Sequence, residues 1–168
     1  MEIKDIPIET FFISKINYGY ILGTYIKMLR NTSKWSQYEH YVVQNYVKRE
    51  IIKKELKWNI DNDEMITLSF YLIDCKQICR KYHIRTLRTI VDLLFVIQDF
   101  YSQKVTDEII NMFPEQKINK DDTIFSLLIR EDNIYAHPDY KHDESHYILK
   151  GICNYNRNEY TIFVGIPR

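Results

Sequence analysis

The residues best suited to chemistry lie in a short stretch near position 130 of this 168-residue chain. Arg130 and His137 stand seven positions apart, and seven helical steps of about 100° return two side chains to nearly the same face. A guanidinium binds phosphate oxygens in a bidentate fork, and an imidazole that titrates near neutral pH can move the proton of a hydroxyl group. Asn133 lies one helical turn before His137, where it can orient the imidazole. The pattern favours metal-independent cleavage of RNA.

A purely structural interpretation of these residues stays open. Glu131 and Asp132 follow Arg130, so the guanidinium can pair with local acids. Pro138 disfavours helical geometry at the residue before it, so His137 can simply end a helix. A group of potential metal ligands also begins there: His137, Asp139, His142, Asp143, Glu144 and His146. The polar sequence around this group favours a solvated loop, and we expect no metal and no other cofactor.

The stretch LLIREDNIYAHP, residues 127–138, resembles the signature of the HEPN superfamily, in which an Arg precedes a His on a late helix. Members of that family are small helical bundles. Many are metal-independent endoribonucleases in toxin, antiphage or CRISPR-linked systems, and others are inactive binding relatives. The resemblance implies that Arg130 holds phosphate and that His137 is the acid–base group. It also implies a homodimer, because the Arg and His pairs of family members commonly meet at a dimer interface.

Basic residues are concentrated in two runs, although the formal net charge is zero. The first run spans residues 48–57. The second contains no acid and includes Lys76, Arg80, Lys81, Arg85 and Arg88. We expect this second run to contact an RNA backbone, with a solvated helix face as the structural alternative.

A different function is also compatible with the composition. The bias toward Ile, Asn, Lys and Tyr suggests an AT-rich phage or viral genome, and small helical proteins of that kind often inhibit a host protein by stoichiometric binding. The tyrosines and the acidic span 107–144 would form the surface, and the acids could imitate nucleic acid. The expected partner is therefore RNA or a host protein.

The elements that must position these residues are expected to be mostly helical, because the chain has only four Gly and four Pro. We predict one domain over residues 1–168, a mainly α bundle of five or six helices. It would comprise a helical part at 6–137, a loop at 138–145 and a C-terminal β-hairpin at 146–166. The expected helices cover residues 10–30, 33–58, 63–82, 86–97, 105–112 and 121–137, and the very apolar 86–97 should be the central one.

The compartment is inferred from absent signals. No apolar run reaches the roughly 18 residues of a membrane span, and the N-terminus MEIKDIPIETFF lacks the apolar core of a signal peptide. Cys75, Cys79 and Cys153 show no disulfide framework, so we expect reduced, buried thiols. These features predict a cytoplasmic protein that does not contact membrane.

Overall fold

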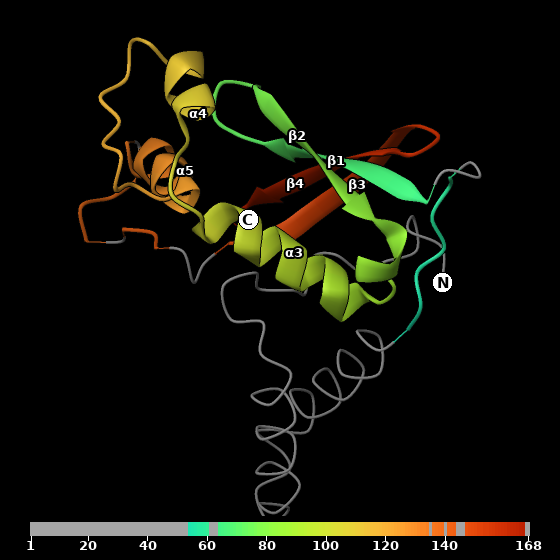
Figure 1. Cartoon of the computed structure of the whole chain (residues 1–168). Helices are drawn as coiled ribbons and strands as arrows, with labels where there is room; N and C mark the ends of the chain where they lie inside the picture. The colour runs from blue at the N-terminus through green and yellow to red at the C-terminus, as the bar shows by residue number, and fades with distance from the viewer. Residues whose placement is uncertain (1–53, 61–63, 135, 140, 144–146, 167–168) are drawn as a thin grey trace, which may run out of the picture.

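A computed structural model describes residues 54–60, 64–134, 136–139, 141–143 and 147–166 of the chain. Within these residues, two β-hairpins enclose three α-helices in the sequence, and the hairpins join into one four-stranded mixed sheet (Figure 1). The prediction of a mainly α bundle with five or six helices is therefore wrong. The expected helices at 10–30 and 33–58 lie outside the described residues, apart from 54–58, which is not helical.

The sheet has the strand order β2-β1-β4-β3. Its central strands, β1 (Met65–Tyr71) and β4 (Glu159–Gly165), run parallel. The outer strands, β2 (Gln77–His83) and β3 (Ile148–Asn156), each pair antiparallel with their hairpin partner. The parallel contact thus joins segments that lie about ninety residues apart in the chain.

The first hairpin replaces the helix expected at 63–82. In β1, Ile66, Leu68 and Phe70 are fully buried while the residues between them are half-buried, which is the alternation of a strand with one covered face. The turn places Asp74 and Cys75 at φ values of 56° and 58°. A positive φ at both central residues matches the twist of a tight hairpin.

The C-terminal hairpin predicted at 146–166 is confirmed by β3 and β4. Its turn contains Asn158 at a φ of 70°, a conformation that Asn adopts more readily than most residues. The pairing shifts register at two bulges along β3, between Leu149 and Gly151 and between Asn154 and Asn156.

The central helix is confirmed, although it begins later than predicted. Helix α3 (Ile90–Ser102) starts at a capping box of Thr89 and Asp92, rather than at Thr86. Thr86 instead ends a short 3-10 helix, η4 (Ile84–Thr86). Helix α3 buries one face against the sheet, and its Phe100 ring stacks on Phe70 with centroids 3.9 Å apart. We call the sheet face that carries Thr67, Ser69 and Tyr71, turned away from these core contacts, the open face.

Helices α4 (Asp107–Met112) and α5 (Ile124–Asn133) gather at the C-terminal end of α3 (Figure 1). Helix α5 starts at a capping box of Thr123 and Ser126, and it buries Phe125 and Leu128 in the common core. It ends at Asn133, four residues before the predicted end near His137.

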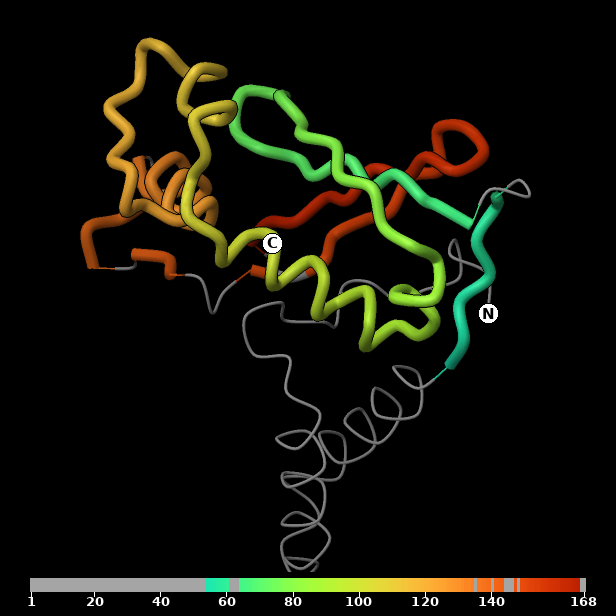
Figure 2. The backbone as a smooth tube through the Cα atoms, in the orientation of Figure 1, coloured from blue at the N-terminus to red at the C-terminus, as the bar shows by residue number. Residues whose placement is uncertain are grey.

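Residues 54–60 form an extended strap at the other end of α3, shown in teal in Figure 2. The amide of Leu56 donates to the carbonyl of Arg88 at 2.7 Å. Further along, the Asn59 carbonyl accepts from the amide of Asn158 at 2.8 Å, and Arg157 donates to the Ile60 carbonyl at 3.2 Å. The strap therefore links the start of α3 to the β3–β4 turn.

The three cysteines are free, as expected, but exposed, so the expectation of buried thiols is wrong. Cys79 and Cys153 occupy β2 and β3 in register with Ser69 and Thr161, which puts both thiols on the open face. Among the described residues, no helix is long and apolar enough to cross a membrane.

Candidate functional site

The structure does not place Arg130 and His137 on one helix. Arg130 lies in the last turn of α5, which ends at Asn133, and His137 follows in a turn of the chain. The expectation that seven helical steps align the two side chains therefore does not hold, because the helix stops after three of them.

Arg130 links α5 to the loop before it. Its guanidinium donates to the carbonyl of Lys117 at 2.7 Å and to the carboxylate of Asp122 at 3.1 Å. Asp122 also accepts from the amide of Asn119 at 3.1 Å. These contacts match the structural alternative in which the arginine satisfies local groups, since a phosphate would have to displace them.

Asn133 uses its side chain to close the loop that carries His137. Its amide nitrogen donates to the His142 carbonyl at 3.0 Å, and its amide oxygen accepts from the His142 amide at 2.8 Å. His137 is 64% exposed, and its Nδ1 accepts from the backbone amide of Asp139 at 3.2 Å. Asn133 is thus committed to the loop backbone, rather than to the imidazole.

The described residues contain no group of three or more His, Cys, Asp or Glu side chains placed to hold a metal ion. Two members of the ligand group considered above, Glu144 and His146, lie outside those residues.

The second basic run does not form one surface, because most of it lies on a strand and not on a helix. Lys76 donates to the Met112 carbonyl and lies 4.9 Å above the Phe113 ring. Arg80 forms an ion pair with Glu108 at 3.6 Å. Both cations therefore hold the first hairpin to α4 and the residue after it.

The remaining cations of this run point elsewhere. Lys81 is exposed on the open face, opposite Thr67, whereas Arg80 lies on the covered face opposite Leu68. Arg85 and Arg88 follow in η4 and in the link to α3, at the far end of the sheet from α4.

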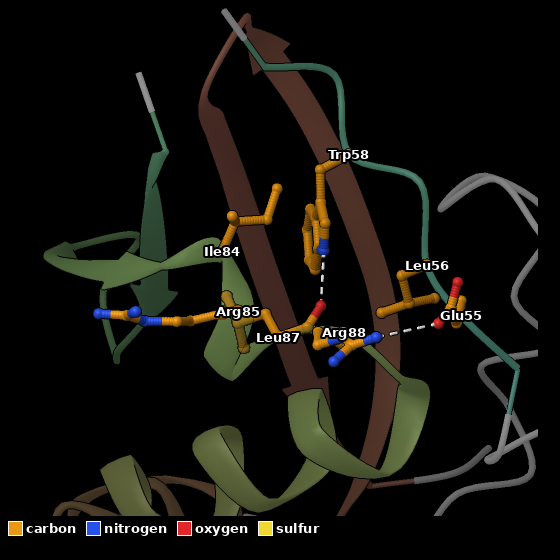
Figure 3. A pocket seen from close by; sticks show the side chains of 7 residues that line it. All are labelled: Glu55, Leu56, Trp58, Ile84, Arg85, Leu87 and Arg88. Carbon is orange, nitrogen blue, oxygen red and sulfur yellow. Dashed lines mark hydrogen bonds and ion pairs between the residues drawn. The ribbon is translucent and has the colours of Figure 1, made fainter. Parts of the chain in front are cut away.

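Arg85 and Arg88 border a hollow of about 320 Å³ between the strap and the link to α3. This volume is near the lower limit for a small-molecule site. We call it the Trp58 hollow; its lining consists of Glu55, Leu56, Trp58, Ile84, Arg85, Leu87 and Arg88. Figure 3 shows the Trp58 ring between apolar side chains, with Arg85 and Arg88 extending to opposite sides. The site thus combines an apolar interior with cations at its rim.

The Trp58 ring is held by two contacts. Its indole nitrogen donates to the Leu87 carbonyl at 2.8 Å, and its ring meets Tyr160 edge-to-face at 4.8 Å between centroids. The Tyr160 hydroxyl in turn accepts from the amide of Asn59. A ligand that stacks on this indole would meet a ring that is already ordered, which lowers the entropic cost of binding.

Local geometry also fixes the backbone that carries the two arginines. His83 caps η4 by accepting from the Arg85 amide at 3.4 Å, and Thr86 donates to the His83 carbonyl at 2.7 Å. Arg88 pairs with Glu55 at 3.3 Å, but the two side chains are 66% and 74% exposed. An exposed pair of this kind contributes at most about 1 kcal/mol, so an anionic ligand can compete for the guanidinium.

The hollow brings together the ends of the two basic runs. The strap carries Lys54 and Lys57 from the first run, and its Leu56 is hydrogen-bonded to Arg88 of the second. Neither Trp58 nor the joining of the runs was expected from the sequence. The signal was the alternation of apolar Leu56 and Trp58 with charged neighbours, which is typical of an extended segment and not of a helix.

No protein-family model, curated protein or solved structure matches this chain. The HEPN resemblance therefore stays a prediction.

Proposed function

We propose that the protein binds single-stranded RNA, with one nucleotide in the Trp58 hollow. The observation that carries this proposal is the meeting of the two basic segments around an ordered tryptophan. Proteins that bind single-stranded nucleic acid commonly combine an aromatic ring that stacks a base with cations that track the backbone. The hollow offers both within one site of about 320 Å³.

The apolar residues of the hollow would contact the base, and its arginines would contact phosphates. Leu56, Trp58 and Leu87 would contact the base through apolar surface, which accepts any base because every base has a π face. Arg88 would exchange its exposed contact with Glu55 for a phosphate oxygen, and Arg85 would hold a neighbouring phosphate. Binding of this type depends strongly on salt and little on base sequence.

The proposal assigns binding and not cleavage to the protein. Cleavage by the HEPN mechanism would need Arg130 and His137 to face one phosphate, whereas Arg130 contacts Asp122 and Lys117. Incubation of the purified chain with single-stranded RNA and EDTA tests this point. We expect intact RNA, and cleavage that disappears in His137→Ala would restore the nuclease interpretation.

The binding experiment is a fluorescence-anisotropy titration of labelled single-stranded RNA at several salt concentrations. Arg88→Ala should weaken binding to all sequences alike and should lower the slope of log K against log salt by about 0.7, the value for one phosphate contact on a single strand. Lys104→Ala is the matched control, because it removes an exposed cation paired with Asp121 near α4 and α5. Equal effects of the two substitutions, or no binding by the unaltered chain, would refute the proposal.

The alternative predicted from the sequence, inhibition of a host protein, gives a different outcome. In that case a protein partner would be captured in a fixed ratio, and nuclease treatment would not affect the capture. The predicted homodimer is tested separately by light scattering on the purified chain, since binding at the Trp58 hollow requires only one copy.

A further inference from the structure

The open face of the sheet carries a second aromatic site, which lies away from the Trp58 hollow. Tyr71 of β1 and Phe163 of β4 are both half-buried, and their ring centroids lie 5.9 Å apart at an interplanar angle of 39°. They project from the two central strands, on the side opposite the buried Phe70 and Ile162. Two half-exposed rings on neighbouring strands form a platform of the size of a base.

A lysine side chain borders this platform at its Gly165 end. A Cβ atom placed on Gly165 would lie 2.8 Å from Cδ of Lys150 and 3.7 Å from its Nζ, so the lysine stem crosses the strand at this glycine. Gly165 is two residues beyond Phe163, and the two positions therefore share a face. Lys81 lies on the same face, toward the other end of β2. One acid of this face, Glu159, is opposite Thr67, in the same row as Lys81 and away from the Gly165 end.

Strand β2 connects the platform to the Trp58 hollow. It begins at Gln77, which is in register with Tyr71, and it ends at His83, directly before η4 and Arg85. Its seven residues span about 20 Å at the usual rise of a strand. Lys81, His83 and Arg85 follow one another along this path, and His83 contacts the carboxylate of Glu64 at 3.0 Å. A nucleic-acid strand lying beside β2 would therefore meet two cations and would have to displace Glu64 from His83.

We propose that Tyr71 and Phe163 stack a second base of the same RNA, while Lys150 contacts its phosphate and Lys81 contacts a phosphate farther along the strand. This inference rests on the proposed function and makes it more specific. The ligand is then an extended single strand that reaches from the open face to the Trp58 hollow, and not a mononucleotide or a duplex.

The test compares a uridine dinucleotide with an oligouridine of about twelve nucleotides, which is within the usual site size of single-strand binding proteins. The double variant Tyr71→Leu, Phe163→Leu keeps apolar bulk but removes both rings. We expect the affinity for the long oligomer to fall about tenfold in the double variant, from the usual contribution of one stacked base. Affinity for the dinucleotide should not change. The pair Tyr71→Phe, Phe163→Tyr should restore binding, because it keeps both rings.

Two further variants keep the test decisive. Phe95→Leu removes a ring that is 44% exposed on α3, on the other side of the sheet, and should leave binding unchanged. Lys150→Gln alters an exposed side chain without risk to the fold, and it should lower the salt slope for the long oligomer by about 0.7.

The outcomes separate this inference from the proposed function. If the long oligomer binds in an Arg88-dependent manner but ignores both the ring double variant and Lys150→Gln, the platform is refuted and the Trp58 hollow stands. If the unaltered chain binds no RNA, both are refuted. If Phe95→Leu matches the loss of the ring double variant, the effect is not specific to the platform and the inference fails.

Discussion

Three tyrosines in the described part of the chain stabilise the fold through both the aromatic ring and the hydroxyl group. Tyr101, Tyr147 and Tyr160 bury their rings in the core. The Tyr101 hydroxyl donates to the Tyr71 carbonyl at 2.7 Å, and the Tyr147 hydroxyl donates to the carboxylate of Asp132. Burial raises the pKa of all three phenols. Packing therefore accounts for these residues, whereas Tyr71 is only half-buried.

Alkaline pH should destabilise the protein through Tyr101. Because burial raises its pKa, the unfolded chain releases the phenol proton near pH 10 and the folded chain retains it. The stabilisation is complete below about pH 10 and is lost as the pH rises above it, with a slope of about 1.4 kcal/mol per pH unit for one such group. Tyr101→Phe should therefore show a shallower decrease in unfolding free energy between about pH 10 and pH 12.

Urea denaturation followed by circular dichroism measures this slope. At neutral pH the same substitution should cost about 1 kcal/mol, because the Tyr71 carbonyl loses its donor. Tyr155→Phe is the control. Tyr155 is 71% exposed, so removal of its hydroxyl group should leave the wild-type slope unchanged. An unchanged slope in Tyr101→Phe would show that its burial does not govern alkaline stability.

At the scale of elements, the first hairpin contains a turn with a strained backbone. Cys75 adopts a φ of 58°, which costs a residue with a Cβ atom about 1–2 kcal/mol. Cys75→Gly should relieve this cost and produce Asp-Gly, a preferred pair for such turns. We expect the free energy of unfolding to rise by about 1 kcal/mol. Thermal denaturation of the reduced protein measures the change.

Asn158 provides a matched comparison in the second hairpin. It has a φ of 70°, but Asn enters this region more readily than Cys, so Asn158→Gly should gain less. If Cys75→Gly is destabilising, the contact of the Tyr71 hydroxyl with its sulfur, at 3.7 Å, contributes more than the strain costs.

The two hairpins explain why only part of the fold could be predicted from the sequence. Asn156-Arg157-Asn158 between apolar runs is an ordinary turn signal, and the C-terminal hairpin was predicted from it. The turn between β1 and β2 contains Asp74-Cys75 and no glycine, so the signal was missed. Without it, the apolar residues of 63–82 were interpreted as a helix. The tertiary pairing of β1 with β4 then decides the outcome, and no local pattern reports a parallel contact of that range.

The end of α5 was mispredicted for a similar reason. Its N-terminal end was predicted to within three residues, because capping is a local property: the predicted start is 121, and the helix begins at Ile124, after its cap Thr123. At the C-terminal end, Asn133 forms two hydrogen bonds with the backbone of His142, nine residues later, and no local pattern predicts this contact. The candidate site likewise combines residues that local sequence identifies with one that only a long-range contact brings in. Arg85 and Arg88 were identified from the basic run, but Trp58 joins them only through the long-range contact of the strap.

At the scale of the whole molecule, the net charge is zero, but positive and negative side chains are concentrated at opposite ends. At one end, the strap, η4 and the link to α3 carry Lys54, Lys57, Arg85 and Arg88, whereas α4, α5 and their loops at the other end carry mostly acids (Figure 1). Such a separation of charge steers a polyanion toward the basic end, and the acidic end does not attract polyanions. The salt dependence of RNA binding should accordingly arise from the strap, from Arg85 and Arg88 and from the lysines of the open face, and not from Arg80 or Lys76.

The most direct test of RNA binding at the hollow uses the fluorescence of Trp58. Trp35→Phe leaves Trp58 as the only tryptophan of the chain. Titration of this variant with single-stranded RNA should change the emission saturably, with the same Kd as the anisotropy measurement, and the change should be lost in Arg88→Ala at the same RNA concentration. RNA that binds by anisotropy without altering Trp58 emission would contradict the account.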